Sequence, residues 1–86
     1  MAKSTITLRF FASIREAVGH GSEEWQTATA DLGALRDELI ARGAPYADCL
    51  ARARAVRMAV DQTMCDESQA VVAGAEVAFF PPVTGG

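Results

Sequence analysis

The chain has 86 residues, of which 50% are hydrophobic and 22% charged, and its formal net charge is -3 at pH 7. This length fits one soluble domain near the lower limit of what a single core can stabilise, and it excludes a second domain. Arginines are scattered among acidic residues rather than gathered in a cationic stripe, and no apolar run approaches the roughly 20 residues of a membrane span, so the composition argues against nucleic-acid binding and against a membrane protein.

The first predicted element is a strand in residues 5–12, TITLRFFA, where apolar and polar residues alternate with a period of two. The apolar positions of one face are Ile6, Leu8 and Phe10. Gly19 and Gly21 then indicate a turn around His20, which we expect to be exposed to solvent. The next stretch, SEEWQTAT (residues 22–29), is a weaker strand candidate. The two segments together predict an N-terminal hairpin.

A helical period follows from Asp31 onward, because three leucines fall on one stripe. They are Leu32, Leu35 and Leu39. The stretch Arg36, Asp37, Glu38 is expected to face away from this stripe. Thr29 or Asp31 can cap the start of the helix, and Gly43 followed by Pro45 indicates its end. A shorter helical turn is possible in residues 46–54, YADCLARAR, with Leu50 and Ala53 facing inward.

The remaining elements are strands. Residues 55–62, AVRMAVDQ, return to a period of two, with Val56, Met58 and Val60 on one face and Arg57 and Ala59 on the other. The polar segment CDESQ (residues 65–69) has room for a short strand on either side. Gly74 then marks a turn into EVAFF, residues 76–80, where Val77 and Phe79 share one face and Ala78 and Phe80 share the other.

This order of elements predicts an α+β architecture in which one main helix packs across a mixed sheet. The β-grasp, or ubiquitin-like, arrangement is the best-known example, and in it the first and last strands lie side by side at the centre of the sheet. We assign residues 1–80 to the β-grasp domain and residues 81–86 to an extended, flexible C-terminal tail.

The tail composition indicates chemistry rather than packing. Pro81 and Pro82 lack backbone donors, so the last strand should stop at Phe80 and the chain should continue in an extended path. Six residues reach at most about 20 Å, and Gly85 and Gly86 have no side chain to prevent entry into a narrow slot. A terminal carboxylate is a poor electrophile, but as an anhydride with AMP it can be attacked by sulfur or an amine. A frayed terminus is the competing explanation of the glycines; their place after a strand and two prolines favours the chemical one.

Four segments resemble the MoaD-type sulfur carriers, the small subunits of molybdopterin synthase. They are LRFFASIREAVG near the start, ALRDEL in the predicted helix, MAVDQ in the third strand and EVAFFPPVTGG at the end. The resemblance covers most of the chain and is weaker between Gly43 and Arg54. Asp61 stands where the family often has asparagine and Ala75 where an aspartate is usual, which puts the turn hydrogen bonds of those side chains in doubt.

The resemblance implies a sulfur-carrier function. Gly86 would be adenylated by an E1-like partner that uses ATP and Mg²⁺, and then converted to a thiocarboxylate with sulfur from a persulfide donor. The tail would enter the large synthase subunit and donate sulfur to cyclic pyranopterin monophosphate, forming the dithiolene of molybdopterin within a heterotetramer. The chain itself would have no complete active site and would bind no cofactor tightly.

Particular residues carry these implied roles. Gly86 matches the sulfur-bearing position, and the inserted tail matches Pro81, Pro82, Val83, Thr84 and Gly85. Phe80 is a candidate partner contact because its face is opposite to that of Phe79, although both phenylalanines could belong to the core. Arg15, with Glu16, matches a charged pair at the end of the first strand that could form salt bridges with a partner; a solvated pair is the alternative.

Other functions compete with this one. A self-contained enzyme or a metal site is disfavoured, because His20 is the only histidine and Cys49 and Cys65 match no redox or zinc spacing. The cysteines are expected to be small buried residues, and the absence of a secretory signal pattern predicts a cytoplasmic location. Three rivals stay open: a thiamine-pathway sulfur carrier, a ubiquitin-like modifier joined to lysines, and a docking module that is never modified.

Overall fold

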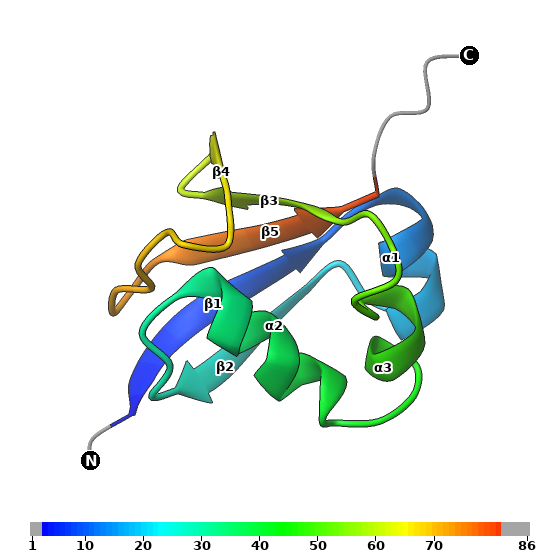
Figure 1. Cartoon of the computed structure of the whole chain (residues 1–86), viewed down its shortest axis with the longest axis horizontal. Coiled ribbons are helices and arrows are strands. Elements are labelled where there is room, and N and C mark those ends of the chain that lie inside the picture. The colour runs from blue at the N-terminus through cyan, green and yellow to red at the C-terminus, as the bar shows by residue number, and fades with distance from the viewer. Residues whose placement is uncertain (1–2, 82–86) are drawn as a thin grey trace.

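Five strands form one mixed sheet in the computed structural model, which describes residues 3–81 (Figure 1). In sheet order the strands are β2 (Ser22–Thr27), β1 (Ser4–Phe10), β5 (Glu76–Phe80), β3 (Arg57–Val60) and β4 (Thr63–Cys65). β1 and β5 pair in parallel, and the other neighbours are antiparallel. The prediction that the first and last strands lie side by side is confirmed.

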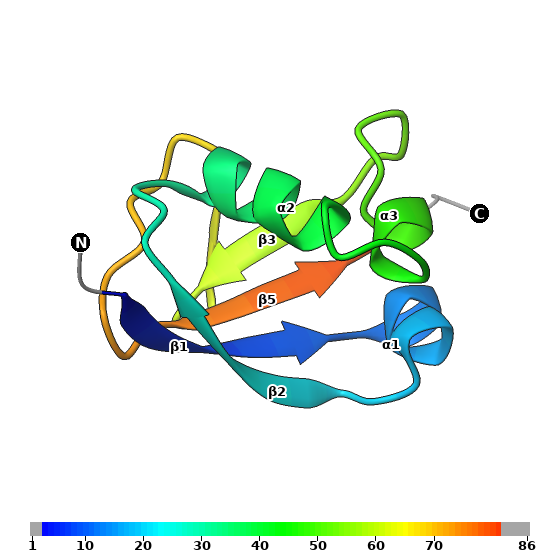
Figure 2. The ribbon, with the colours of Figure 1, turned by 90° about the horizontal axis from the view of Figure 1, so that it is seen from below.

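The helices form a second layer on one face of this sheet (Figure 2). α2 (Leu32–Ile40) crosses that face, α3 (Tyr46–Cys49) follows it, and α1 (Ala12–Val18) lies at the end of the sheet where β1 stops. The predicted α+β, β-grasp arrangement is therefore confirmed. None of the helices within residues 3–81 is long and apolar enough to cross a membrane.

α2 forms where the leucine stripe predicts it. Asp31 caps the helix, because its Oδ1 accepts a hydrogen bond from the backbone N–H of Ala34 at 2.9 Å. All three leucines of the stripe are fully buried. They meet the inner face of the sheet, whose central contact is a stacked pair of rings, Phe10 on β1 and Phe79 on β5, with centroids 6.1 Å apart.

The predicted N-terminal hairpin is wrong in its connection. β1 and β2 do pair antiparallel, with Ile6 opposite Trp25, but α1 stands between them instead of a turn. This helix has only seven residues and buries a single side chain, Ile14. It ends at Gly19, which adopts φ +89°, a left-handed conformation that glycine allows without strain. A helix this short has too few apolar positions to set a clear period.

Two orientations in the middle of the chain are also corrected. Arg36, expected on the outer side of α2, is only 4% exposed. Ala53, expected to face inward, is exposed, because the chain turns at Ala51 and Arg54, whose backbone O and N–H are joined at 2.9 Å. Leu50 is fully buried as predicted. The helical turn predicted for residues 46–54 does not continue past Leu50, because α3 ends at Cys49.

Asp61 keeps a structural role at the turn between β3 and β4. It and Gln62 both have positive φ, 49° and 71°, as a tight antiparallel turn requires. The Asp61 Oδ1 accepts a hydrogen bond from the backbone N–H of Glu76 at 3.0 Å, which ties the turn to the start of β5. The departure from asparagine therefore leaves this bond in place. Ala75, the other departure, is buried in the core.

Candidate functional site

The base of the tail lies between two neighbouring segments of chain. β5 ends at Phe80, as the diproline predicts, and the following Pro81 is half-buried. Phe80 is the cross-strand partner of Arg57 on β3. On the other side, the backbone N–H of Phe11 donates a hydrogen bond to the carbonyl of Phe79 at 3.2 Å. The point from which the tail departs is thus held by both neighbours of β5 (Figure 1).

Most of the predicted tail residues lie outside the described residues 3–81. These are Pro82, Val83, Thr84, Gly85 and Gly86. The described part of the site is therefore the surface from which the tail starts.

The two phenylalanines at the end of β5 belong to different faces of the sheet. Phe79 is fully buried against Phe10. Phe80 is half-buried on the opposite face, where its ring meets the edge of Phe11 with centroids 5.9 Å apart. Phe79 is therefore a core residue, and Phe80 is the one that a partner can reach.

Phe80 belongs to a larger apolar surface on the sheet face that no described helix covers. We call this surface the outer patch; it consists of exposed Phe11 and Met64 and half-buried Phe80, with the buried Ala59 and Ala78 between them. The register places Ala59 beside both Ala78 and Met64, so two small side chains separate the aromatic pair from the methionine. Phe11 is 41% and Met64 51% exposed, values unusual for such large apolar side chains.

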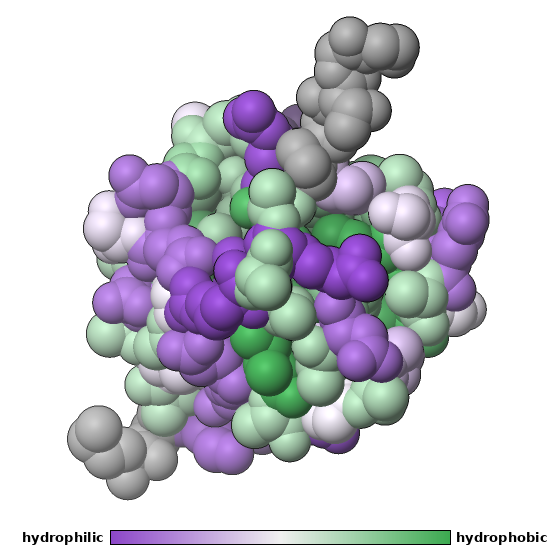
Figure 3. All heavy atoms as spheres, turned by 45° about the vertical axis from the view of Figure 1, so that its right-hand side comes forward, coloured by the Kyte–Doolittle hydropathy of each residue, from purple (hydrophilic) through white to green (hydrophobic). Residues whose placement is uncertain are grey.

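Sequence reasoning identified Phe80 as a partner contact and placed Phe11 on the face opposite Phe10, but it gave Phe11 no role and missed Met64. Strand parity could have found Met64, which alternates with Cys65. On the side of the molecule in Figure 3, hydrophilic residues are interspersed with hydrophobic ones.

Several cations stand near the outer patch and the tail base. Arg9 donates to Glu76 at 3.2 Å and lies over the Phe11 ring, 5.6 Å from its centroid. Arg57 is exposed and joins no ion pair within residues 3–81. Arg15, predicted at the end of the first strand, lies instead in α1, where it is exposed, and its guanidinium lies across Gly21. Acidic side chains border the apolar surface as well, because Asp66 and Glu67 line a hollow together with Arg57 and Met64.

On the helix side, Glu23 accepts hydrogen bonds from two side chains, Nη1 of Arg42 at 2.6 Å and the hydroxyl of Tyr46 at 3.2 Å. The Arg42 guanidinium lies over both the Trp25 ring, at 4.4 Å, and the Tyr46 ring, at 3.9 Å. Partial burial acts to raise the pKa of Glu23, but the hydrogen bond and charge of Arg42 outweigh it, so that the pKa is lowered. This cluster joins β2 to the segment between α2 and α3.

His20 takes part in this structure rather than standing free in a loop. It is half-buried, its ring is edge-on to Phe10 at 5.7 Å, and its Nε2 lies 3.5 Å from Oε2 of Glu23. The expectation of a solvent-exposed loop histidine is confirmed only in part, because the side chain is 39% exposed but packs against Phe10. Its Nε2 has no hydrogen-bond partner among the described residues.

Cys49 and Cys65 are both half-buried free thiols. Burial raises the pKa of each, so neither thiol is activated as a nucleophile at neutral pH. Among residues 3–81 no three His, Cys, Asp or Glu side chains converge to hold a metal ion.

Arg36, on α2, donates side-chain hydrogen bonds to the segment that follows α3 and to Glu67. Its Nε donates to the carbonyl of Leu50 at 2.8 Å, and its Nη2 donates to the carbonyls of Ala51 at 2.7 Å and Arg54 at 2.9 Å. Its Nη1 pairs with Glu67 at 2.9 Å. We call this set of contacts the Arg36 clasp. It fixes the segment that leads into β3, and no sequence signal marked it.

Arg52 extends the clasp at the surface. It donates to Asp37 and to the carbonyl of Gly33, each at 2.9 Å, and also pairs with Glu67. The hydrogen bond from Arg52 has the largest effect on the pKa of Glu67 and lowers it; burial opposes this, but with the hydrogen bond from Arg36 and the charges of both arginines the pKa stays below its ordinary value.

The comparisons with known proteins point to one family. The model of the ThiS family matches residues 8–86. The Haemophilus influenzae protein named molybdopterin synthase sulfur carrier subunit is 36% identical over 81 residues, covering 94% of this chain and 99% of that protein. The Escherichia coli protein of the same name is 38% identical over 81 residues, with the same coverage.

Solved structures agree in fold. The Haloferax volcanii HVO 2177 protein has a TM-score of 0.79 and 30% identity, covering 99% of this chain and 89% of that one. A complex of subunits 1 and 2 of the molybdopterin-converting factor from Helicobacter pylori contains a chain with a TM-score of 0.62 and 23% identity, covering 95% of this chain and 99% of that one. At 23% identity the second likeness concerns the fold alone.

Proposed function

Because this chain belongs to the ThiS family, we propose that it is the sulfur-carrier subunit of a molybdopterin synthase. The observation that carries the proposal is the near full-length likeness, at 36% and 38% identity, to two proteins with that name. The terminal sequence FFPPVTGG, which begins with the last two residues of the central strand, supports the same role.

In this proposal the reacting atom is the carbonyl carbon of Gly86. An E1-like partner joins the Gly86 carboxylate to AMP, using ATP and Mg²⁺, and the outer sulfur of a persulfide donor displaces AMP to give an acyl persulfide. A second thiol then cleaves the S–S bond, forms a disulfide with the donor and releases the thiocarboxylate. The thiocarboxylate sulfur is then passed to cyclic pyranopterin monophosphate. The raised pKa values of Cys49 and Cys65 disfavour the other means of carrying sulfur, a persulfide on the chain's own thiols.

The residues before the tail position it. The chain leaves β5 at Pro81, which can donate no further ladder hydrogen bond. The segments on either side of β5 fix the direction of departure, through the Arg57–Phe80 pairing and the hydrogen bond between Phe11 and Phe79. Residues 81–86, at most about 20 Å long when extended, would then enter the large subunit.

We assign the docking of the large subunit to the outer patch, which adjoins the tail base. It offers aromatic side chains at the surface, the residue type that most often dominates interface energies. Arg15, at the same end of the molecule, would contact the rim of such an interface. The Helicobacter pylori complex, which pairs subunits 1 and 2 of the molybdopterin-converting factor, agrees with a two-subunit assembly.

The proposed chemistry is tested by intact-protein mass spectrometry. After incubation with ATP, Mg²⁺, the adenylating partner, a persulfide donor and a thiol reductant, we expect one oxygen-to-sulfur exchange at the terminus. Lysine-linked adducts without a thiocarboxylate would instead favour a ubiquitin-like modifier. A thiocarboxylate that the large subunit neither binds nor consumes would favour a thiamine-pathway carrier.

The docking assignment predicts that Phe80→Ala weakens binding to the large subunit by about tenfold or more, the range expected for truncating an aromatic anchor. Isothermal calorimetry with the purified large subunit measures the change. Val72→Ala is the matched control, because Val72 is 55% exposed but lies before the start of β5, at the opposite end from Phe80. Equal affinities of both variants and the wild type would exclude the outer patch as the docking surface.

A further inference from the structure

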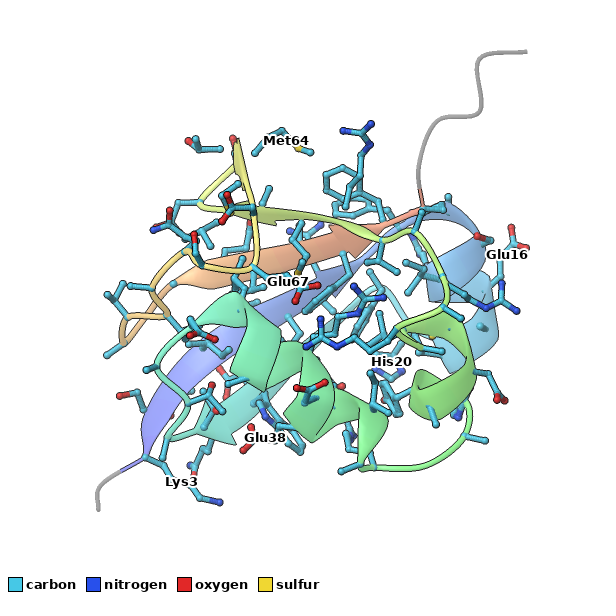
Figure 4. All side chains as sticks on the ribbon, in the orientation of Figure 1. Lys3, Glu16, His20, Glu38, Met64 and Glu67 are labelled. Atoms are coloured by element: carbon cyan, nitrogen blue, oxygen red, sulfur yellow. The ribbon has the colours of Figure 1, made fainter. Side chains whose placement is uncertain are left out.

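Lysine is almost absent from this chain. Of its 8 basic residues only Lys3 is a lysine, and the others are all arginines. Lys3 precedes β1, and Figure 4 shows it at one end of the molecule, with Glu16 of α1 at the other end. The tail base lies at the α1 end, because Phe79 pairs with Phe10 at the last position of β1. The only side-chain amine is therefore at the pole opposite to the tail base.

Some of the arginines have a structural reason to be arginine. Arg36 and Arg52 each use several guanidinium nitrogens at once, and Arg42 stacks between two aromatic rings. An ammonium group cannot reproduce either geometry. Lysine at these three positions would lose hydrogen bonds or ring stacking that hold the fold together.

Arg54 and Arg57 have no such reason. Both are exposed, and neither side chain joins an ion pair within the part of the chain that the structure describes. Arg57 is nevertheless the cross-strand partner of Phe80, the last residue before the tail, and Arg54 lies in the segment leading to it. Lysine would satisfy the fold here equally well, so the choice of arginine calls for a chemical explanation.

The explanation lies in what an activated carbonyl does near an amine. A lysine amine has a pKa of about 10.4 and a small neutral fraction that attacks acyl groups, whereas a guanidinium stays protonated and does not. Resting on the proposed function, we infer that arginine beside the tail base protects the activated Gly86 carbonyl from capture by the chain's own side chains. The Gly86 acyl group can then be transferred to sulfur, while the chain's own side chains accept it poorly.

The length of the tail keeps Gly86 away from Lys3. From Phe80 the tail reaches at most about 20 Å, while Lys3 lies seven residues before Phe10 along an extended strand, about 23 Å away. Reaching Lys3 would require a fully extended tail to run back along the whole sheet. A lysine at position 57 would instead lie beside the start of the tail, at an effective concentration of about 1 mM for a short flexible connection.

The reaction that arginine prevents is a plain acyl transfer. The neutral amine nitrogen attacks the Gly86 carbonyl carbon, a C–N bond forms, the bond to the leaving group breaks, and the ammonium proton passes to water. The leaving group is AMP from an adenylate or a thiolate from a thioester. No oxidant or reductant takes part, and the product is an amide that can no longer accept sulfur.

The test uses the full chain bearing a thioester of a small thiol at Gly86, so that it needs neither ATP nor any partner protein. Wild type, Arg57→Lys and Gln26→Lys are incubated at mildly alkaline pH and about 10 µM, and amide formation is followed by intact mass and peptide mapping. Gln26 is exposed and pairs with Thr5, near Lys3, so Gln26→Lys adds an amine at the distant pole. Circular dichroism checks that all three fold alike.

We expect Arg57→Lys to form the internal amide about a hundredfold faster than either other protein forms any amide, the ratio of about 1 mM effective concentration to 10 µM. The wild type and Gln26→Lys should mainly hydrolyse. Equal amide formation in Arg57→Lys and the wild type would overturn the inference, as would rapid capture by Lys3 in the wild type. Since the thioester bypasses enzymatic activation, these outcomes are independent of whether the thiocarboxylate experiment succeeds.

Discussion

A chain lacking Gly86 is expected to fold normally and to lose sulfur transfer completely. The truncation removes no core residue, since the last buried strand position is Phe79. It does move the terminal carboxylate back by one residue, about 3.3 to 3.6 Å along the chain, which is far more than an activated complex tolerates. Reconstituted synthase activity measures the loss of sulfur transfer, and thermal unfolding of the same preparation checks that the chain folds normally.

Two companion variants sharpen the truncation experiment. A chain extended by one glycine keeps every residue but buries the reactive carbonyl in a peptide bond, so it should be equally inactive. Gly85→Ala keeps the carboxylate in place and adds only a methyl group, so its loss should be partial. Full activity of the truncated chain would show that the terminus carries no sulfur, and the docking-module alternative would then hold.

Breaking the Arg36 clasp should have the largest effect on stability. Arg36→Met keeps the packing of the aliphatic stem but leaves the carbonyls of Leu50, Ala51 and Arg54 without their donors. Lost partners of buried polar groups cost about 1 to 3 kcal/mol each, and partial access of water reduces the sum, so we expect a loss of about 2 to 4 kcal/mol. That is a large fraction of the stability of a domain this small.

Urea unfolding of Arg36→Met and Arg52→Met compares the stability lost at the buried arginine with that lost at the exposed one. Arg52 belongs to the same network but is exposed, so its removal should cost less than about 1 kcal/mol. The unfolding midpoint of Arg36→Lys should lie between those of the wild type and Arg36→Met, because an ammonium group reaches fewer of the carbonyl acceptors than a guanidinium does. Similar midpoints for Arg36→Met and Arg52→Met would mean that burial adds nothing to the role of Arg36.

The sheet and the main helix were predictable because their signals are periodic. Alternation in β1 and the leucine stripe of α2 each extend over enough positions to distinguish a period of two from one of 3.6. The end of β5 at Phe80 follows from the chemistry of proline alone. The separate faces of Phe79 and Phe80 follow from strand parity.

The features that sequence reasoning missed depend on contacts between distant residues. The burial of Arg36 is determined by backbone carbonyls 14 to 18 residues further along the chain, which no local pattern reveals. The position of His20 depends on Phe10 and Glu23 together. α1 was missed because it buries only Ile14. The outer patch becomes visible only when Phe11, Phe80 and Met64, from three strands or their ends, are brought to one face.

The central position of β5 has a consequence for the order of events during synthesis. β1 and β2 form one pair and β3 and β4 another, and only β5 bridges them. The bridging strand follows the other four along the chain, so the two pairs can join into one sheet only after residues 76–80 have been synthesised. A chain cut short before residue 76 would therefore hold two separate strand pairs, each with an unpaired inner edge.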